Sequence, residues 1–96
     1  MPFIYYGDEY AMAGGEDPDC RRGMLWDESR QDADMFAWYR ELIRIRKSNP
    51  AITEGKVTSC ICDDVQRKLV LTRECESEKV SIAFDFKQYT VEVKNF

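Results

Sequence analysis

The chain has 96 residues, of which 44% are hydrophobic and 33% are charged, and its formal net charge is -4. This length accommodates one small domain of ordinary globular composition. The acidic balance argues against a nucleic-acid partner, because nucleic acid requires clustered Lys and Arg. We also expect no membrane segment and no signal peptide, since no apolar run approaches the roughly 20 residues that span a bilayer.

The first predicted element is a short strand over residues 3–6. Its apolar and aromatic run does not alternate, which is typical of a strand buried on both faces of a parallel sheet. From Asp8 to Asp32 the sequence has turn chemistry, including Gly14-Gly15 and Asp17-Pro18. Loops of this length are uncommon and usually functional.

A helix is predicted from about Ala33 to Ser48. Its apolar stripe repeats every three or four residues, at Met35, Trp38, Tyr39, Leu42 and Ile45. Asp32 or Asp34 can cap its start, where the helix dipole favours negative charge. Asn49-Pro50 ends it, because the residue before a proline avoids the helical region.

Antiparallel strands are predicted after the helix. Residues 80–86 and 89–93 alternate apolar with polar or small side chains, as half-buried strands do. Alternation is less clear over residues 69–75 and weakest over 57–62. Turn residues separate these segments, at Asp63-Asp64, Glu76-Ser77-Glu78 and Lys87-Gln88. Short strands joined by short turns indicate a meander.

The four cysteines, at positions 20, 60, 62 and 75, allow two disulfides in a secreted protein. Cys60 and Cys62, however, share one face of a strand and are poorly placed to bond each other. We therefore favour reduced thiols and a cytoplasmic location. Because the chain has no His and no second Cys pair, we expect neither a metal site nor a cofactor.

Adjacent carboxylates follow the predicted first strand, at Asp8 and Glu9. Paired carboxylates carry out much of hydrolytic chemistry. Neighbours on an extended chain point to opposite faces, however, so these two are unsuited to act as a catalytic pair. We expect them to bind backbone N–H groups or to cap a turn.

Asp17 and Arg21 are four residues apart in the loop. Together a carboxylate and a guanidinium offer several acceptors and donors to sugar hydroxyl groups. The alternative is a salt bridge that only holds the loop's shape, and the chemistry alone favours that alternative. The aromatic side chains of Tyr5, Tyr6, Tyr10 and Trp26 have a similar ambiguity, because they suit either stacking on sugar rings or core packing.

Two stretches carry a family resemblance. They are Pro2-Phe3-Ile4-Tyr5-Tyr6-Gly7-Asp8-Glu9, and Asp17-Pro18-Asp19-Cys20-Arg21-Arg22 with Met24 and Trp26-Asp27 after it. The first resembles the eighth barrel strand and following loop of the α-amylase superfamily of glycoside hydrolases. The second is similar to a loop of its neopullulanase, cyclomaltodextrinase and maltogenic amylase branch. The helix through Ala51 resembles the last barrel helix, and Glu54-Gly55 with the strands after it resembles the start of the C-terminal β-sandwich.

The resemblance implies an α+β fragment. Residues 1–52 would be the end of a (β/α)₈ barrel, with one strand, a long loop and the last helix. Residues 53–96 would be a small antiparallel β-sheet or half sandwich, shorter than the family's usual C-terminal domain. In the family, the three catalytic acids come from barrel strands four, five and seven, upstream of the segment matched by Met1, so the resemblance implies that this chain has no catalytic residue.

The resemblance also implies a role for Asp17 and Arg21, because the matching residues in this branch contact sugar on the non-reducing side of the cleaved bond. The expected partner, in a full-length parent, is an α-glucan or maltooligosaccharide with α-1,4 or α-1,6 bonds. A non-catalytic module for assembly or weak carbohydrate binding is the alternative, and accidental similarity is a third. The apolar first strand, without neighbours, also predicts self-association.

Overall fold

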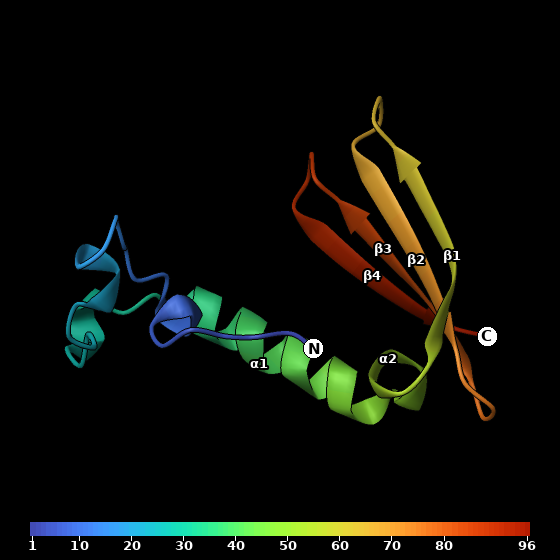
Figure 1. Cartoon of the computed structure of the whole chain (residues 1–96), viewed down its shortest axis with the longest axis horizontal. Helices are drawn as coiled ribbons and strands as arrows, with labels where there is room; N and C mark the ends of the chain where they lie inside the picture. The colour runs from blue at the N-terminus through green and yellow to red at the C-terminus, as the bar shows by residue number, and fades with distance from the viewer. The chain divides into compact units, whose positions relative to one another are not determined.

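The computed structural model describes residues 1–96, which form two compact units, Met1–Ile43 and Arg44–Phe96. The boundary falls inside α1, Ala33–Ser48, which is green in Figure 1. The predicted assignment of residues 1–52 to a barrel and 53–96 to a β-domain concerns the family's domains, and it stays a prediction. The two units are described separately below.

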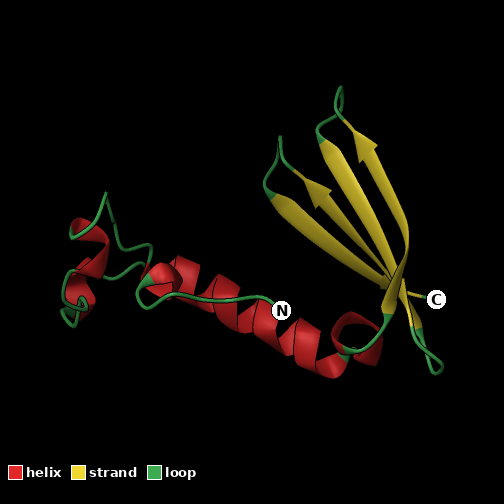
Figure 2. Cartoon of the chain, viewed as in Figure 1, coloured by secondary structure: helices red, strands yellow, loops and turns green.

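The first unit consists mainly of loop, with three short 3₁₀ helices (Figure 2). These are η1, Asp8–Tyr10; η2, Asp19–Arg21; and η3, Glu28–Arg30. The strand predicted over residues 3–6 is wrong, because this segment has no regular structure and the Phe3 side chain is 84% exposed. A strand requires a neighbouring strand for its backbone groups, and no segment supplies one. The Tyr5 N–H donates instead to Asp8 Oδ2, at 2.9 Å.

The helix prediction is confirmed, because α1 spans Ala33–Ser48. Of the two proposed capping residues, Asp32 performs the role, since its Oδ1 accepts a hydrogen bond from the Met35 N–H at 2.9 Å. The apolar stripe is less covered than its periodicity suggests. No α1 residue is fully buried, and Trp38 is 41% exposed.

A second helix, α2, spans Pro50–Thr53 and was not predicted. Pro50 ends α1, yet it also occupies the first turn of α2, where its missing N–H costs nothing and its fixed φ suits a helix. Asn49 between the helices is extended, and its Nδ2 donates to the Ile45 carbonyl at 2.6 Å. That hydrogen bond satisfies an orphan carbonyl at the end of α1.

Four strands form one antiparallel sheet in the order β1-β2-β3-β4, so the predicted meander is confirmed (Figure 2, yellow). The strands are β1, Lys56–Asp63; β2, Lys68–Glu74; β3, Lys79–Asp85; and β4, Thr90–Asn95. The predicted turns lie between them. Arg67 and Tyr89, at two of the turns, have positive φ of 54° and 55°.

The register places apolar side chains on one face of the sheet. One cross-strand row is Cys60, Leu71, Ile82 and Val93, and the next is Cys62, Leu69, Phe84 and Val91. On the opposite face, one row is polar, with Ser59, Thr72, Ser81 and Lys94, whereas another is largely apolar, with Ile61, Val70, Ala83 and Glu92. The single sheet therefore has one apolar face and one mixed face, without a second sheet layer.

The two edges of the sheet differ. The pairing of β1 with β2 is irregular between Val57 and Ser59, as in a β-bulge. The pairing of β4 with β3 runs without interruption from Asn95, opposite Val80, to Thr90, opposite Asp85. The edge at β4 is therefore the more regular one.

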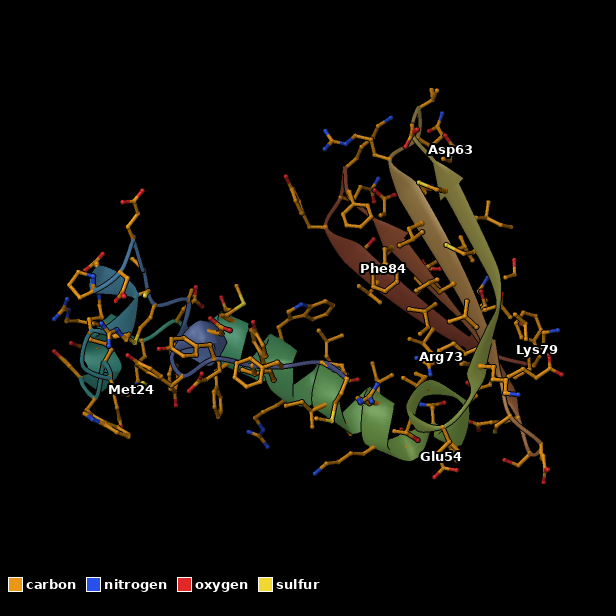
Figure 3. All side chains as sticks on the ribbon, viewed as in Figure 1. Met24, Glu54, Asp63, Arg73, Lys79 and Phe84 are labelled. Atoms are coloured by element: carbon orange, nitrogen blue, oxygen red, sulfur yellow. The ribbon has the colours of Figure 1, made fainter.

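The core of the second unit lies where α2 meets one end of the sheet. Its buried apolar residues are Ala51, Ile52 and Val80. Two side chains tie α2 and the chain after it to the sheet. Glu78 Oε1 accepts from the Ala51 N–H at 2.7 Å, and Arg73 Nη2 donates to the Gly55 carbonyl at 2.5 Å. Figure 3 shows Arg73 at this end of the sheet and Asp63 at the opposite end.

Candidate functional site

The loop of the first unit is shaped by carboxylates that bind backbone amides. Besides the Asp8 contact, Glu9 Oε2 accepts from the Gly7 N–H at 3.0 Å. The expectation that Asp8 and Glu9 bind backbone N–H groups is thus confirmed. Gly7 has φ of 91°, and a Cβ there would lie 2.5 Å from Met12 Sδ, so the turn requires glycine.

The structure brings Arg21, at the end of η2, together with Asp17, which lies just before η2. Arg21 donates from Nε to Asp17 Oδ1 at 2.7 Å, and its Nη2 lies 2.7 Å from the same oxygen. Both side chains are about two-thirds exposed, at 66% for Asp17 and 65% for Arg21. The second carboxylate oxygen and the Nη1 group therefore remain available to an external hydroxyl group. The geometry is consistent with a salt bridge that orders the loop and with a polar pair that faces a ligand.

A second ion pair lies directly beside the first. Arg22 Nη2 donates to both carboxylate oxygens of Asp19, at 2.6 and 2.5 Å. The Arg22 carbonyl accepts from the Tyr6 hydroxyl group at 2.6 Å, which ties η2 to the N-terminal segment. Arg22 is therefore fixed at both its backbone and its side chain.

A hollow of about 430 Å³ opens beside η2 within the first unit. Arg22 and Arg30 supply its charged groups, and Met12, Met24 and Leu25 are among its apolar residues. Met24 is labelled in Figure 3. The loop around the hollow is held by Gln31, whose Nε2 donates to the Leu25 carbonyl at 2.7 Å. Sequence reasoning missed Arg22 and Arg30, although adjacency to Arg21 was a signal for Arg22.

The aromatic side chains of this unit divide into packed and exposed groups. Tyr10 stacks on Phe36 with 5.0 Å between ring centroids and 7° between planes, and it lines the hollow as well. Tyr5 and Tyr6 contact each other at 4.5 Å. Trp26 is 79% exposed. Trp26 therefore has the open ring face that stacking on a sugar would require.

Acidic groups of the loop are engaged locally rather than with one another. The Ser29 hydroxyl group donates to Asp27 Oδ1 at 2.7 Å and the Ser29 N–H at 3.0 Å, and these bonds lower the pKa of Asp27. No group of three or more His, Cys, Asp or Glu side chains is placed to hold a metal ion. The site thus offers hydrogen bonds, ring faces and an arginine-lined hollow.

A smaller hollow of about 250 Å³ lies in the second unit, at the turn after β1. Its lining includes Cys62, Asp64 and Arg67. Cys62 Sγ lies 3.6 Å from Asp64 Oδ1, and this contact raises the pKa of the Cys62 thiol. All four cysteines are free thiols.

Comparison with known proteins identifies relatives over most of the chain. "Neopullulanase 2" of Thermoactinomyces vulgaris is 40% identical over 84 residues, which are 88% of this chain and 14% of that protein. "Intracellular maltogenic amylase" of Bacillus subtilis strain 168 is 37% identical, over 86% of this chain and 14% of that protein. A solved structure named "Cyclomaltodextrinase" matches with a TM-score of 0.75 and 35% identity, over 85% of this chain and 14% of that one.

The resemblance predicted from the sequence is therefore confirmed, because the chain is homologous to proteins with these names. The sheet and helix match the C-terminal region of cyclomaltodextrinase structures. The chain spans about one seventh of the length of these relatives, at 14%. No protein-family profile matches it. None of its helices has the length and apolar character needed to cross a bilayer.

Proposed function

We propose that this homologue of neopullulanase, cyclomaltodextrinase and maltogenic amylase is the C-terminal portion of a retaining α-glucan hydrolase. In this proposal the parent acts on α-1,4 and α-1,6 glucosidic bonds. Residues 1–52 are the end of its catalytic barrel, and residues 53–96 begin its C-terminal β-domain. The match to "Neopullulanase 2" covers 88% of this chain but only 14% of that protein. This coverage supports the proposal that the chain is one part of a longer enzyme.

The role proposed for Asp17 and Arg21 is to bind sugar in the wall of the substrate cleft. The single observation that carries it is their exposed ion pair at η2, with a 2.7 Å contact that leaves one carboxylate oxygen and one guanidinium nitrogen unused. A fixed pair presents an acceptor beside a donor, as neighbouring sugar hydroxyl groups require. The exposed ring of Trp26 adds a face for stacking.

The chain by itself is proposed to be inactive. Retaining hydrolysis needs a nucleophile and an acid/base with carboxyl groups about 5–5.5 Å apart. The acids of the loop are engaged in other roles, with Asp8 and Glu9 on backbone amides and Asp19 on Arg22. We propose that the catalytic carboxylates belong to a part of the parent outside this chain.

The test combines activity with binding. Pure protein incubated with starch, pullulan and cyclodextrins should release no reducing sugar. Titration with maltotriose, followed by NMR chemical shifts, should perturb the amides of residues 17–26, and Arg21→Ala should weaken that binding about tenfold, because a charge-assisted hydrogen bond is lost. Turnover by pure protein would reject the proposal that the chain lacks its catalytic acids.

The matched control is Lys87→Ala, which also removes one exposed positive charge but lies in the turn before β4. It should leave maltotriose binding unchanged. Equal losses from Arg21→Ala and Lys87→Ala would mean that net charge, rather than the loop pair, governs binding. No binding by any variant would reject the sugar-contact role of Asp17 and Arg21.

A second candidate function is a non-catalytic module for assembly. It is favoured by apolar side chains that the first unit leaves exposed, at 84% for Phe3 and 79% for Trp26. In this form the N-terminal segment would mediate self-association. We also propose a cytoplasmic location, supported by the word "intracellular" in the name of the Bacillus subtilis relative and by the free thiols.

A further inference from the structure

The turn that carries Asp17 and Arg21 has little means of holding its own shape. η2 has three residues, and no side chain caps its N-terminus. Such short 3₁₀ turns are marginal, because few hydrogen bonds offset the entropy lost when the backbone is ordered. The ion pair itself is about two-thirds exposed, and exposed pairs contribute little in water. The position of the pair therefore depends on contacts from outside the turn.

The hydroxyl group of Tyr6 supplies such a contact. It donates to the Arg22 carbonyl at 2.6 Å, across 16 positions of the sequence. Arg22 directly follows Arg21, so this bond fixes the backbone next to the arginine of the pair. The other hydrogen bonds of residues 17–22 remain within residues 16–22. Tyr6 therefore joins the turn to a part of the first unit that is distant in sequence.

Hydrogen bonds within the turn connect this anchor to the ion pair. The Arg22 side chain binds both carboxylate oxygens of Asp19, and the Arg22 N–H donates to the Asp19 carbonyl at 3.3 Å. The Arg21 N–H donates to the Pro18 carbonyl at 3.0 Å. With the backbone of Arg21 held in this way, its guanidinium group needs only the contact with Asp17 to be oriented.

We propose that Tyr6 is a positioning residue, whose hydroxyl group holds Arg21 beside Asp17 in the orientation that binds sugar. It acts through the Arg22 carbonyl and makes no contact with the sugar itself. The inference rests on the sugar-contact role proposed above for the pair. A donor and an acceptor that are already in place lose less conformational entropy when a ligand binds, so the order of the turn increases affinity.

Tyr6→Phe in the full chain tests this role, because it removes the hydroxyl group and keeps the ring. The Kd for maltotriose, measured by NMR titration, should rise about fivefold, since the hydrogen bond that orders the turn is lost. The Arg21 Nε–H, which donates to Asp17 Oδ1 at 2.7 Å, should exchange faster with solvent. A ring that stacked on the sugar would predict an unchanged Kd instead, and that result overturns the proposal.

Tyr5→Phe is the matched control. Tyr5 is the adjacent tyrosine and has nearly the same exposure, 40% against 41% for Tyr6. Its hydroxyl group is hydrogen-bonded to Tyr6, and this bond raises the pKa of Tyr5. The variant leaves the bond from Tyr6 to the Arg22 carbonyl in place, so both the Kd and the exchange rate should change by less than about twofold. Equal effects of Tyr5→Phe and Tyr6→Phe would overturn the proposal.

A double variant separates positioning from an independent contact with the sugar. If Tyr6 acts through Arg21, the combined Tyr6→Phe, Arg21→Ala variant should bind maltotriose no more weakly than Arg21→Ala alone. Additive losses would overturn the proposal, as would an unchanged exchange rate of the Arg21 Nε–H in Tyr6→Phe. Circular dichroism checks that each variant is folded.

Failure of the sugar-contact role gives a different result. In that case Arg21→Ala binds maltotriose as well as the original chain does, or no variant binds at all. The exchange rate of the Arg21 Nε–H is measured without sugar, so it still decides whether the Tyr6 hydroxyl group holds this side chain in place.

Discussion

The two units of this chain are held together by different interactions. In Arg44–Phe96 the backbone is satisfied by sheet hydrogen bonds, and a buried core lies beneath α2. In Met1–Ile43 no hydrophobic residue is fully buried, and single carboxylates bind single amides or guanidinium groups. The hydrogen bonds of a sheet form cooperatively and resist local opening. Isolated exposed ion pairs and hydrogen bonds each contribute little to the free energy of unfolding. Stability therefore resides in the sheet unit, while the candidate sugar contacts lie in the loop unit.

Replacing one glycine of each unit with alanine should give the largest difference in the free energy of unfolding between the units. A Cβ at Gly55 would collide with the Ala51 carbonyl oxygen and lie 2.9 Å from that of Glu74, both of them backbone atoms. We expect Gly55→Ala to lower the free energy of unfolding by about 3 kcal/mol. Gly23 has open space around it, so Gly23→Ala should change this free energy by less than about 0.5 kcal/mol. Urea denaturation followed by circular dichroism measures both, and equal effects would contradict the contrast.

Truncating one apolar side chain in each unit should give a smaller difference in stability between the units. Val80 is fully buried, so Val80→Ala removes core contacts and should cost about 2 kcal/mol. Phe3 is a larger side chain but is 84% exposed, and Phe3→Ala should cost less than about 0.5 kcal/mol. A large loss of thermal stability in Phe3→Ala would show that the N-terminal segment is packed in solution.

Lowering the pH should give the smallest difference in stability between the two units. Hydrogen bonds from the Gln88 and Lys87 amides lower the pKa of Asp85, and those from Ser29 lower the pKa of Asp27, both below the ordinary value of 3.8. A lowered pKa in the folded state stabilises the protein above pH of about 4, and the contribution is lost as the pH falls further. Asp85→Asn should thus narrow the difference in Tm between pH 7 and pH 3.

Asp27→Asn is the counterpart in the loop unit. It should leave that Tm difference unchanged while altering the NMR signals of the Ser29 amide, because the loop contact is local. If the two variants changed the acid sensitivity of Tm equally, the loop would have to be part of the cooperative unit.

The sequence predicted those elements whose signals are local. The start of α1 follows from Asp32 and its end from Asn49-Pro50, so both boundaries were found. The meander followed from alternation and short turns. The strand over residues 3–6 failed because a strand depends on neighbours that its own residues do not encode. The helix α2 has four residues, too few for a period to appear, and Pro50 was interpreted only as an end.

The candidate site shows the same limit. The pairing of Asp17 with Arg21 could be anticipated, because residues four apart in a turn-rich loop readily meet. The hollow that includes Arg22 and Arg30 could not, since its walls come from segments brought together by the path of the loop, with contacts such as that from Gln31 to the Leu25 carbonyl. The sequence showed which charged and polar side chains the loop contains, but it did not show that the loop folds into a hollow beside them.

The irregularity between Val57 and Ser59 bears on how β1 stays aligned with its neighbour. A slip of this strand by one residue would move each of its side chains to the other face of the sheet. A bulge gives the extra residue a defined place. Beyond it, Cys60 remains opposite Leu71 and Cys62 opposite Leu69, so the irregular residue preserves the alignment of the rest of the strand.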